Sequence, residues 1–262
     1  MSKQTKPLVI KIGGAILEKA DALTALLKVI AELKNQPVVL VHGGGCVVDD
    51  MLCQAGFATE KKNGLRVTSA EQMPIISGAL AGHVNKVIVA QANSLHLNAV
   101  GLSLADGNMV KCVISPLDLG AVGEPKASQS KLLDNLLKGE FLPVVSSIGA
   151  LESGELVNVN ADDAAVVICQ LLNAELLLLT DVNGVMDGSG NYLSDLTEQD
   201  AKLLIQSGII HGGMTAKVNA AFHAANQLRR SIAVASWQAP EQIPSLLSGA
   251  NVGTRIIPEL AA

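Results

Sequence analysis

The sequence predicts an α/β protein in which helices pack on a central, mostly parallel sheet. Short apolar runs rich in Val, Ile and Leu alternate along the chain with longer segments of helical periodicity, a pattern typical of buried strands joined by helices. Hydrophobic residues make up 49% of the 262 residues and aromatic residues only 2%, so the core must consist of aliphatic side chains. This length allows one domain or two lobes.

Composition also limits the partners of the protein. The net charge is -5 and no dense basic cluster carries interleaved aromatic residues, so we expect no nucleic-acid partner. No apolar run approaches the ~18 residues of a membrane span, and Lys11 and Glu18 interrupt the apolar start that a signal peptide needs. We therefore expect a soluble, cytoplasmic protein without membrane contact.

The cysteines form no C-x-x-C pair and lie in apolar stretches, so we expect reduced structural thiols rather than disulfides or a zinc site. They are Cys46, Cys53, Cys112 and Cys169. Reduced thiols agree with a cytoplasmic location.

The first predicted strand covers residues 8–12 and is followed by Gly13 and Gly14, then by a helix over about residues 17–34. Lys11 stands near the end of this otherwise apolar strand. One interpretation is a solvated lysine at a sheet edge. Its position beside two glycines favours a contact with phosphate, because glycine turns expose backbone N–H groups that bind anions.

Residues 37–50, PVVLVHGGGCVVDD, predict a buried strand, a glycine turn and the start of a helix. Gly43, Gly44 and Gly45 have no Cβ to keep a ligand from the backbone, and the N–H groups of a helix N-terminus favour an anion. The P-loop string is absent, and Val48 stands where a dinucleotide fingerprint needs its third glycine. A tight turn without a ligand is the alternative, but three consecutive glycines favour an anion site.

Residues 61–67 contain Asn63-Gly64, a strong signal for a two-residue hairpin, with Arg66 just past the turn. Arg66 is either an exposed hairpin charge or a ligand contact, and the spacing does not separate the two. Overlapping capping boxes at residues 68–71 and 69–72 then predict a long helix that reaches about residue 94.

After that helix the sequence predicts strands over residues 98–104 and 109–114, joined as a hairpin at Asp106-Gly107. The next elements are expected in this order: a turn-rich connection at residues 120–125, a helix at 128–138 and a buried strand at 142–147.

Residues 156–163 alternate apolar and polar side chains before a predicted helix at residues 164–172. Side chains two apart on an extended segment share a face, so Asn158 and Asn160 can point the same way, with Asp162 entering the first turn of the helix. Asn and Asp at a helix start are usually caps. Capping leaves Asn158 and one aspartate for another task.

Residues 175–180 predict another buried strand, which ends at the polar, glycine-containing loop 181–188. Open α/β sheets bind ligands at the carboxyl ends of parallel strands. Lys217 is expected in the first turn of a helix at residues 214–228, where it marks either a bound anion or a surface lysine tolerated at small cost. The remaining predicted elements are a helix capped by Thr197, strands at residues 231–236 and 252–256, and a helix that begins near Pro240.

These motifs together resemble those of the amino acid kinase family. They are K-I-G-G at residues 11–14, V-H-G-G-G at 41–45, N-G-L-R at 63–66, N-V-N-A-D at 158–162 and M-x-x-K at 214–217. Each is modest alone, but they occur in the family's order along nearly the whole chain. The resemblance is closest to bacterial members that phosphorylate N-acetyl-L-glutamate in arginine biosynthesis.

The resemblance implies a fold and a reaction. The fold is one domain over residues 1–262, a three-layer α/β/α sandwich with a central, mainly parallel sheet, in which residues 1–173 bind the acyl amino acid and residues 174–262 bind ATP. The reaction is in-line phosphoryl transfer from ATP to the side-chain carboxylate of N-acetyl-L-glutamate. That carboxylate, with a pKa of ~4.3, is already ionised at neutral pH, so catalysis rests on positioning and charge neutralisation. Mg²⁺ is expected to arrive with ATP, and no protein ligand is assigned to it.

The resemblance also implies roles for individual residues. Lys11 and Lys217 would stabilise the transferring phosphoryl group, and Asp162 would organise both lysines. The substrate-binding set is Gly44, Gly45, Arg66, Asn158 and Asn160. The nucleotide-binding set is Gly13, Gly14, Asp181, Val182, Asn183, Gly184, Val185, Met186, Ile209, Ile210 and His211.

Two departures from the family pattern matter. His211 and Gly212 stand where small polar and acidic residues are expected. Arginine-inhibited, hexameric members carry an N-terminal helical extension, whereas the first strand here starts within ten residues. We therefore expect a homodimer without arginine feedback.

Two alternative functions stay open. One is another kinase of this fold, acting on aspartate, glutamate, carbamate or a nucleoside monophosphate. Arg66 together with Asn158 favours a small acylated amino acid instead. The other is a nucleotide-binding regulatory protein that has lost the chemistry, and the presence of Lys11, Asp162 and Lys217 argues against it.

Overall fold

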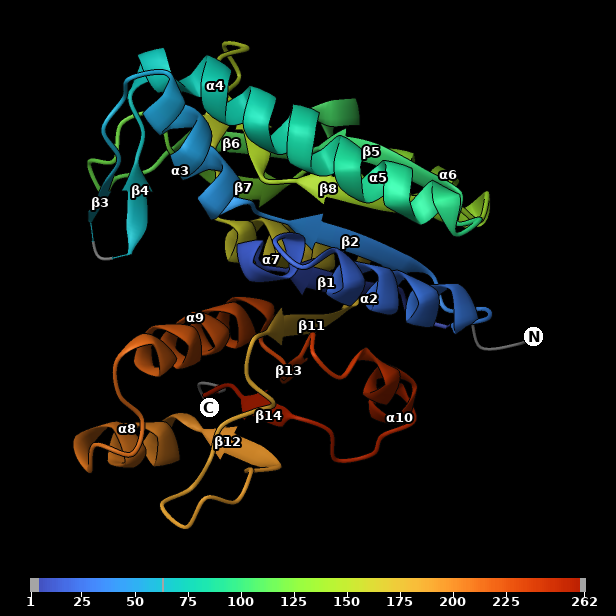
Figure 1. Cartoon of the computed structure of the whole chain (residues 1–262), viewed down its shortest axis with the longest axis vertical. Helices are drawn as coiled ribbons and strands as arrows, with labels where there is room; N and C mark the ends of the chain where they lie inside the picture. The colour runs from blue at the N-terminus through green and yellow to red at the C-terminus, as the bar shows by residue number, and fades with distance from the viewer. Residues whose placement is uncertain (1–4, 63, 260–262) are drawn as a thin grey trace.

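The computed structural model describes residues 5–62 and 64–259. Its centre is an eight-stranded sheet in the order β12-β14-β13-β11-β1-β2-β8-β5 (Figure 1). The strands are β1 Leu8–Ile12, β2 Val38–His42, β5 Ala99–Ser103, β8 Leu142–Ser146, β11 Glu175–Thr180, β12 Asp195–Thr197, β13 Ile232–Ser236 and β14 Thr254–Ile257. Neighbouring strands are parallel except β13 and β14, which confirms the prediction of a mainly parallel sheet.

Helices cover both faces of this sheet. They are α1 Gly14–Leu17, α2 Ala20–Glu32, α3 Gly45–Gln54, α6 Lys131–Lys138, α7 Ala161–Leu172, α8 Glu198–Gln206, α9 Gly213–Leu228 and α10 Ile243–Leu247, with short 3₁₀ turns η3 Asp106–Asn108 and η4 Pro240–Gln242. The sequence predicted one helix over residues 17–34, and its predicted start is wrong. The structure has two helices here, α1 and α2, and Glu18 and Lys19 between them are not helical.

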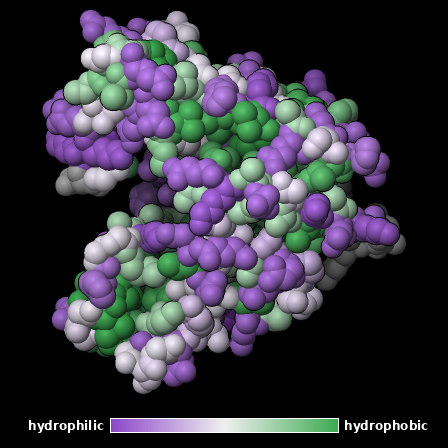
Figure 2. Space-filling model, viewed as in Figure 1, coloured by the Kyte–Doolittle hydropathy of each residue, from purple (hydrophilic) through white to green (hydrophobic). Residues whose placement is uncertain are grey.

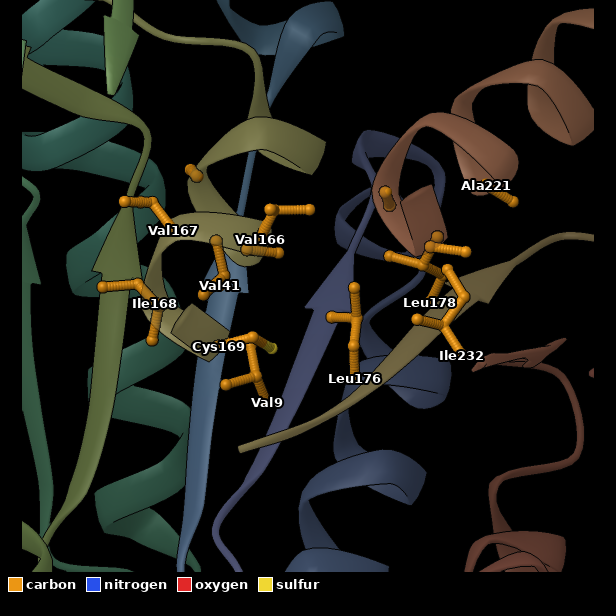
Figure 3. Close-up of a cluster of buried hydrophobic side chains, with 14 of the residues drawn as sticks. Val9, Val41, Val166, Val167, Ile168, Cys169, Leu176, Leu178, Ala221 and Ile232 are labelled. Carbon is orange, nitrogen blue, oxygen red and sulfur yellow. The ribbon is translucent and has the colours of Figure 1, made fainter. Parts of the chain in front are cut away.

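The alternation of side chains along each strand divides the core into two layers. On β1, Leu8 and Ile10 pack in one buried cluster with Leu26 and Leu27 of α2, whereas Val9 packs in the other. Figure 3 shows this second cluster, in which α7 and α9 meet side chains of the central strands. Because successive residues of a strand point to opposite faces, an uninterrupted apolar run buries both.

The long helical stretch Ala70–Ser94 is formed by η1 Ala70–Gln72, α4 Met73–Ser77, the π-helical segment η2 Gly78–Val84 and α5 Asn85–Ser94. It begins with the predicted capping box of Ser69 and Gln72. By length and composition this 25-residue stretch could cross a membrane, contrary to the expectation from the sequence. Such a stretch is weak evidence for a membrane span, because core helices of soluble proteins have the same composition, and Ile76, Leu80 and Ile88 are buried in the protein core.

Three small antiparallel ladders lie outside the main sheet. They are β3 Glu60–Lys62 with β4 Leu65–Val67, β6 Val110–Ile114 with β7 Gly123–Ala127, and β9 Ile148–Ala150 with β10 Leu156–Asn158. The first is the predicted hairpin, although Asn63 in its turn lies outside the described residues.

The predicted hairpin around Asp106-Gly107 is wrong. β5 pairs in parallel with β8 inside the main sheet, and β6 pairs with β7, so the expected turn-rich connection at residues 120–125 contains a strand. The Asp106 carboxylate accepts a 2.6 Å hydrogen bond from the backbone N–H of Ser103. This bond closes a local turn at the end of β5.

The cysteines also differ in part from expectation. All four are free thiols, but Cys46 and Cys53 are exposed on α3 and only Cys112 and Cys169 are buried. An apolar neighbourhood in the sequence therefore did not predict burial on this amphipathic helix.

Candidate active site

Two glycine turns and one polar loop of the predicted site follow the carboxyl ends of three adjacent strands. Ile12 of β1 is paired with His42 of β2 and with Leu179 of β11, so the glycine turns after β1 and β2 and the polar loop after β11 start at one edge of the sheet. Figure 2 shows the surface hollowed between the β3–β4 hairpin and helix α9. Two cavities are built from these segments.

The first cavity has a volume of about 240 Å³ and contains the whole predicted substrate-binding set. Gly44, Gly45, Arg66, Asn158 and Asn160 all line it, together with apolar side chains that include Val48, Ile76 and Leu80. These residues come from the β2–α3 turn, the β3–β4 hairpin, the long helix and the segment before α7. Residues far apart in the sequence thus surround one small space.

Packing explains why glycine is needed at position 44. A Cβ there would lie 2.9 Å from Leu80 Cδ2 and 3.1 Å from Val84 Cγ2, because the long helix packs directly beneath the turn. The absence of a Cβ lets the turn backbone lie on that helix. Helix α3 starts at Gly45, so the unpaired N–H groups of its first turn belong to the same turn.

Arg66 is held in place by the protein itself. Its Nη1 lies 2.6 Å from Asp49 Oδ1, and its Nη2 donates a 3.3 Å hydrogen bond to Gly45 O. Lys61 Nζ lies 3.5 Å from the other oxygen of Asp49. Burial of Asp49 works to raise its pKa, but the hydrogen bonds and charges of Arg66 and Lys61 together hold that pKa below its usual value.

The two asparagines have different local tasks. Asn160 caps α7, because its Oδ1 accepts hydrogen bonds from the N–H groups of Asp162 at 2.8 Å and Asp163 at 3.4 Å. Consequently α7 starts at Ala161, earlier than the predicted Ala164. Asn158 Nδ2 donates to Thr68 Oγ1 at 3.2 Å, which leaves its amide oxygen free of any hydrogen bond to a described residue.

Lys11 and Asp162 form a close ion pair. Lys11 Nζ lies 2.8 Å from Asp162 Oδ1, and their side chains are only 18% and 26% exposed. The pair joins β1 to the first turn of α7. In this partly buried setting the two charges interact more strongly than on the open surface.

Lys217 has a different partner from the one expected. It forms an ion pair with Asp181, in the loop after β11, rather than with Asp162. Lys217 is the fifth residue of α9, so it lies beyond the first turn in which the sequence predicted it. The hydrogen bond from Lys217 lowers the pKa of Asp181.

The second cavity has a volume of about 380 Å³ and is built around this loop. It is lined by all the predicted nucleotide-binding residues of the two C-terminal segments, which are Asp181, Val182, Asn183, Gly184, Val185, Met186, Ile209, Ile210 and His211. Gly13 and Gly14 line neither cavity. A Cβ on Gly14 would lie 3.6 Å from Gly45 N, so this glycine turn lies against the turn that follows β2.

Comparison with known proteins identifies the family. The model of the amino acid kinase family matches residues 6–236. The chain belongs to the amino acid kinase family. A protein named acetylglutamate kinase from Colwellia psychrerythraea is 72% identical over 253 residues, covering 97% of each chain, and one from Aeromonas salmonicida is 49% identical over 98% of this chain and 99% of its own. The carbamate kinase structure from Giardia superposes with a TM-score of 0.67 at 16% identity, over 98% of this chain and all of that one, and shows the shared fold.

The second cavity of this amino acid kinase contains two residues that sequence reasoning missed, Tyr192 and Gln238. Met214 of the M-x-x-K motif, to which the sequence assigned no binding role, also lines it. Gln238 Nε2 donates to Asp181 O at 3.1 Å, and the Tyr192 hydroxyl accepts a 3.4 Å hydrogen bond from Asn183 Nδ2. The sequence signal for Tyr192 was its rarity, since it is the single tyrosine in a chain with 2% aromatic residues.

Among the described residues, no group of three or more His, Cys, Asp or Glu side chains could hold a metal ion. The cationic side chains and backbone donors of the site suit anions. Arg66, Lys11, Lys217 and the N–H groups of the glycine turns supply positive charge or hydrogen-bond donors along one edge of the sheet. Such an arrangement can bind two negatively charged reactants and neutralise charge between them.

Proposed function

We propose that this chain transfers the γ-phosphoryl group of ATP to the side-chain carboxylate of N-acetyl-L-glutamate, forming N-acetyl-L-glutamyl 5-phosphate in arginine biosynthesis. The observation that carries the proposal is full-length identity of 72% to a relative named acetylglutamate kinase. The two cavities support it, because one presents Arg66 and glycine N–H groups and the other adjoins Lys217.

The first cavity supports a small substrate with carboxylate groups. An Arg66 guanidinium can hold a carboxylate through two parallel hydrogen bonds, and the free oxygen of Asn158 can accept a hydrogen bond from the acetamido N–H. The apolar side chains of Val48, Ile76 and Leu80 suit the methylene and methyl groups of the ligand.

Phosphoryl transfer in this site needs no general base. The ionised carboxylate oxygen forms a bond to the γ-phosphorus as the bond from that phosphorus to the bridging oxygen of ADP breaks. Lys11 and Lys217 offset the negative charge of the equatorial oxygens, and the Gly44 and Gly45 N–H groups add neutral donors. Asp162 holds Lys11 in position through the 2.8 Å ion pair.

ATP binding is assigned to the second cavity, and Mg²⁺ would arrive with the nucleotide. Mg²⁺ keeps several water ligands and is commonly bound through phosphate oxygens, which suits a protein whose described residues offer no three-ligand cluster. When bound, it would neutralise phosphate charge. We assign residues 1–173 to the amino-acid-substrate lobe and residues 174–262 to the ATP lobe, within one domain.

The cellular setting is also part of the proposal. Four free cysteines suit a reducing, cytoplasmic compartment, and the net charge of -5 argues against nucleic acid as a partner. We further infer a homodimer without membrane contact or arginine feedback. Light scattering would test the dimer, and a hexameric mass or inhibition by millimolar arginine would refute this part.

The test of the reaction is MgATP-dependent formation of an acyl phosphate, trapped as its hydroxamate. N-acetyl-L-glutamate is compared with glutamate, aspartate, carbamate and UMP as acceptors. We expect product only with N-acetyl-L-glutamate, and a loss of about 10²–10³ in kcat for Lys11→Ala. Lys202→Ala is the matched control, because Lys202 is 61% exposed and pairs with Glu198 on the surface of α8.

Two results would overturn the assignment in different ways. Turnover of another acceptor would retain the fold and chemistry but change the substrate. ATP binding without turnover of any acceptor would favour a regulatory protein that has lost the activity.

A further inference from the structure

A buried polar pair lies directly behind the glycine turn. His42 is the last residue of β2 and Asn85 the first of α5, and both side chains are fully buried. Asn85 Nδ2 lies 3.0 Å from His42 Nε2, and His42 Nδ1 lies 2.8 Å from Gly43 O. Buried polar groups are costly unless they are satisfied, and neither residue has a task in the reaction described above.

The hydrogen bonds fix which atoms of Asn85 face which partner. Its Nδ2 lies 2.8 Å from the Val144 carbonyl oxygen, which can only accept, so the nitrogen must be on this side. Its Oδ1 accepts a 3.1 Å hydrogen bond from Lys86 Nζ, which can only donate. The amide nitrogen therefore also faces His42.

The orientation of Asn85 in turn fixes the tautomer of His42. Asn85 Nδ2, which also faces Leu102 O at 3.3 Å, can only donate, and Gly43 O can only accept. Both contacts of the ring therefore agree with an imidazole proton on Nδ1 and Nε2 as the acceptor. The proton on Nδ1 is donated to Gly43 O. Burial, together with the nearby Lys86 charge, lowers the pKa of His42 to about 4 although its contact with the Gly43 backbone works to raise it. The ring is neutral at physiological pH.

This bond orients the peptide between Gly43 and Gly44. In a trans peptide the C=O and N–H groups point in opposite directions, and the described chain has no cis peptide bond. Drawing the Gly43 carbonyl towards His42 therefore directs the Gly44 N–H away from it. Among the described residues no backbone acceptor pairs with that N–H, and Gly44 lines the first cavity.

The long helical stretch Ala70–Ser94 contacts the glycine turn in two ways. Leu80 and Val84 pack against Gly44, and Asn85 follows them at the end of the π-helical segment Gly78–Val84. π-helical segments occur frequently at functional sites, because the extra residue in the turn changes where the following side chains point. Here the side chain after the segment points at His42.

We propose that His42 and Asn85 are positioning residues, which hold the Gly43–Gly44 peptide so that the Gly44 N–H is presented to the reacting anionic group in the first cavity. The inference rests on the proposed function, since it assigns these residues to the phosphoryl-transfer step. It differs from a purely structural role, which would alter stability and leave the turnover of the folded enzyme unchanged.

The test uses Asn85→Leu, which removes the donor to His42 and keeps a similar side-chain volume. We expect kcat with N-acetyl-L-glutamate to fall by about 10²-fold, the size seen when one positioned donor is lost, while KM for ATP changes less than threefold. Asn93→Leu is the matched control, because Asn93 lies on the same helix and its Oδ1 accepts from the Ala99 N–H at 2.8 Å, in the strand β5. It should alter stability and leave kcat unchanged.

Substitutions of His42 test the role of Nδ1 as the donor to Gly43 O. In His42→Asn the amide nitrogen takes the place of Nδ1 and can still donate to Gly43 O, so most of the turnover should return. His42→Leu has no donor and should lose about as much kcat as Asn85→Leu. The ¹⁵N shifts of the His42 ring in the wild type should report a proton on Nδ1, independently of activity.

The outcomes distinguish this inference from the proposed function. Wild-type turnover of N-acetyl-L-glutamate tests the function, and the ratio of variant to wild-type kcat tests the positioning role. Folded Asn85→Leu with kcat within threefold of wild type, or a proton on Nε2 of His42, would overturn the inference. If Asn85→Leu does not fold, Asn85→Ser, which retains a hydroxyl for Val144 O, must show the same fall in kcat.

Discussion

The Arg66 guanidinium lies 2.6 Å from the Asp49 carboxylate and joins the β3–β4 hairpin to helix α3. Only 10% of the Arg66 side chain is exposed, and its second Nη donates to Gly45 O. Contacts within the protein therefore hold the arginine in place. A substrate carboxylate that binds there does not need to order a long, flexible side chain, which lowers the free-energy cost of binding.

Replacing Asp49 with Asn should weaken substrate binding. The variant leaves Arg66 without its ion-pair partner. The substrate must then order that side chain when it binds, which reduces the binding free energy. We expect KM for N-acetyl-L-glutamate to rise about tenfold, equivalent to about 1.4 kcal/mol, with kcat within threefold of wild type. Asp50→Asn, at an exposed neighbouring position on α3, is the control. A lowered KM would instead mean that Asp49 competes with the substrate for Arg66.

Removing the Lys217 ammonium group should affect turnover more than nucleotide binding. Lys217→Ala is expected to lower kcat by about 10²–10³, because its charge is assigned to the transferring phosphoryl group. Asp181→Asn leaves the lysine in place and should cost about tenfold or less. Steady-state kinetics at varied ATP would separate kcat from KM, and equal losses for both variants would show that the ion pair acts as a unit.

A methyl group on Gly44 should disturb the turn. In Gly44→Ala the new Cβ would lie 2.9 Å from Leu80 Cδ2, so the turn or the helix must shift. Overpacking of this kind costs about 1–3 kcal/mol, and kcat should fall as the backbone N–H groups move. Gly82→Ala, with no atom within 4 Å of its added Cβ, should retain full activity. Thermal melts and kinetics of the double variant Gly44→Ala/Leu80→Ala would show whether removing the contact restores the stability and kcat.

The neutral, buried His42 should make stability depend on pH. Its folded-state pKa of about 4 lies below the ordinary value of 6.5, so the unfolded chain binds more protons and stability falls as pH decreases from 6.5 through 4. The full contribution is about 3 kcal/mol. Lys86 is the charged group that faces this ring and helps to lower its pKa. Urea unfolding of His42→Asn should lack this part of the slope, whereas exposed His96→Gln should retain it. Identical slopes for wild type and His42→Asn would contradict the prediction.

Much of the fold was predictable from local patterns in the sequence. The strands β1, β2, β8 and β11 appear as apolar runs because each is buried on both faces. The capping box at Ser69 and Gln72 was also recognisable, because a cap requires only residues that are close in sequence.

Pairings between distant segments were not predictable in this way. An Asp-Gly turn between two apolar runs suggested a hairpin, yet β5 pairs with β8, which follows it by about forty residues. Likewise, the sequence could not show that Lys217 meets Asp181 rather than Asp162, or that Tyr192 lines the second cavity. Each depends on how the loops after parallel strands pack together.

The sequence by itself determined the layered α/β architecture, the glycine turn after β2 and the family, because these depend on periodicity, missing Cβ atoms and motif order along the chain. Only the tertiary structure decided which charges are paired, which residues share a cavity and which side chains His42 contacts. The physical reason is range: hydrophobic patterning and capping act within a few residues, whereas the Asn85–His42 hydrogen bond joins side chains 43 residues apart. Such a contact exists only after the helix has packed on the sheet.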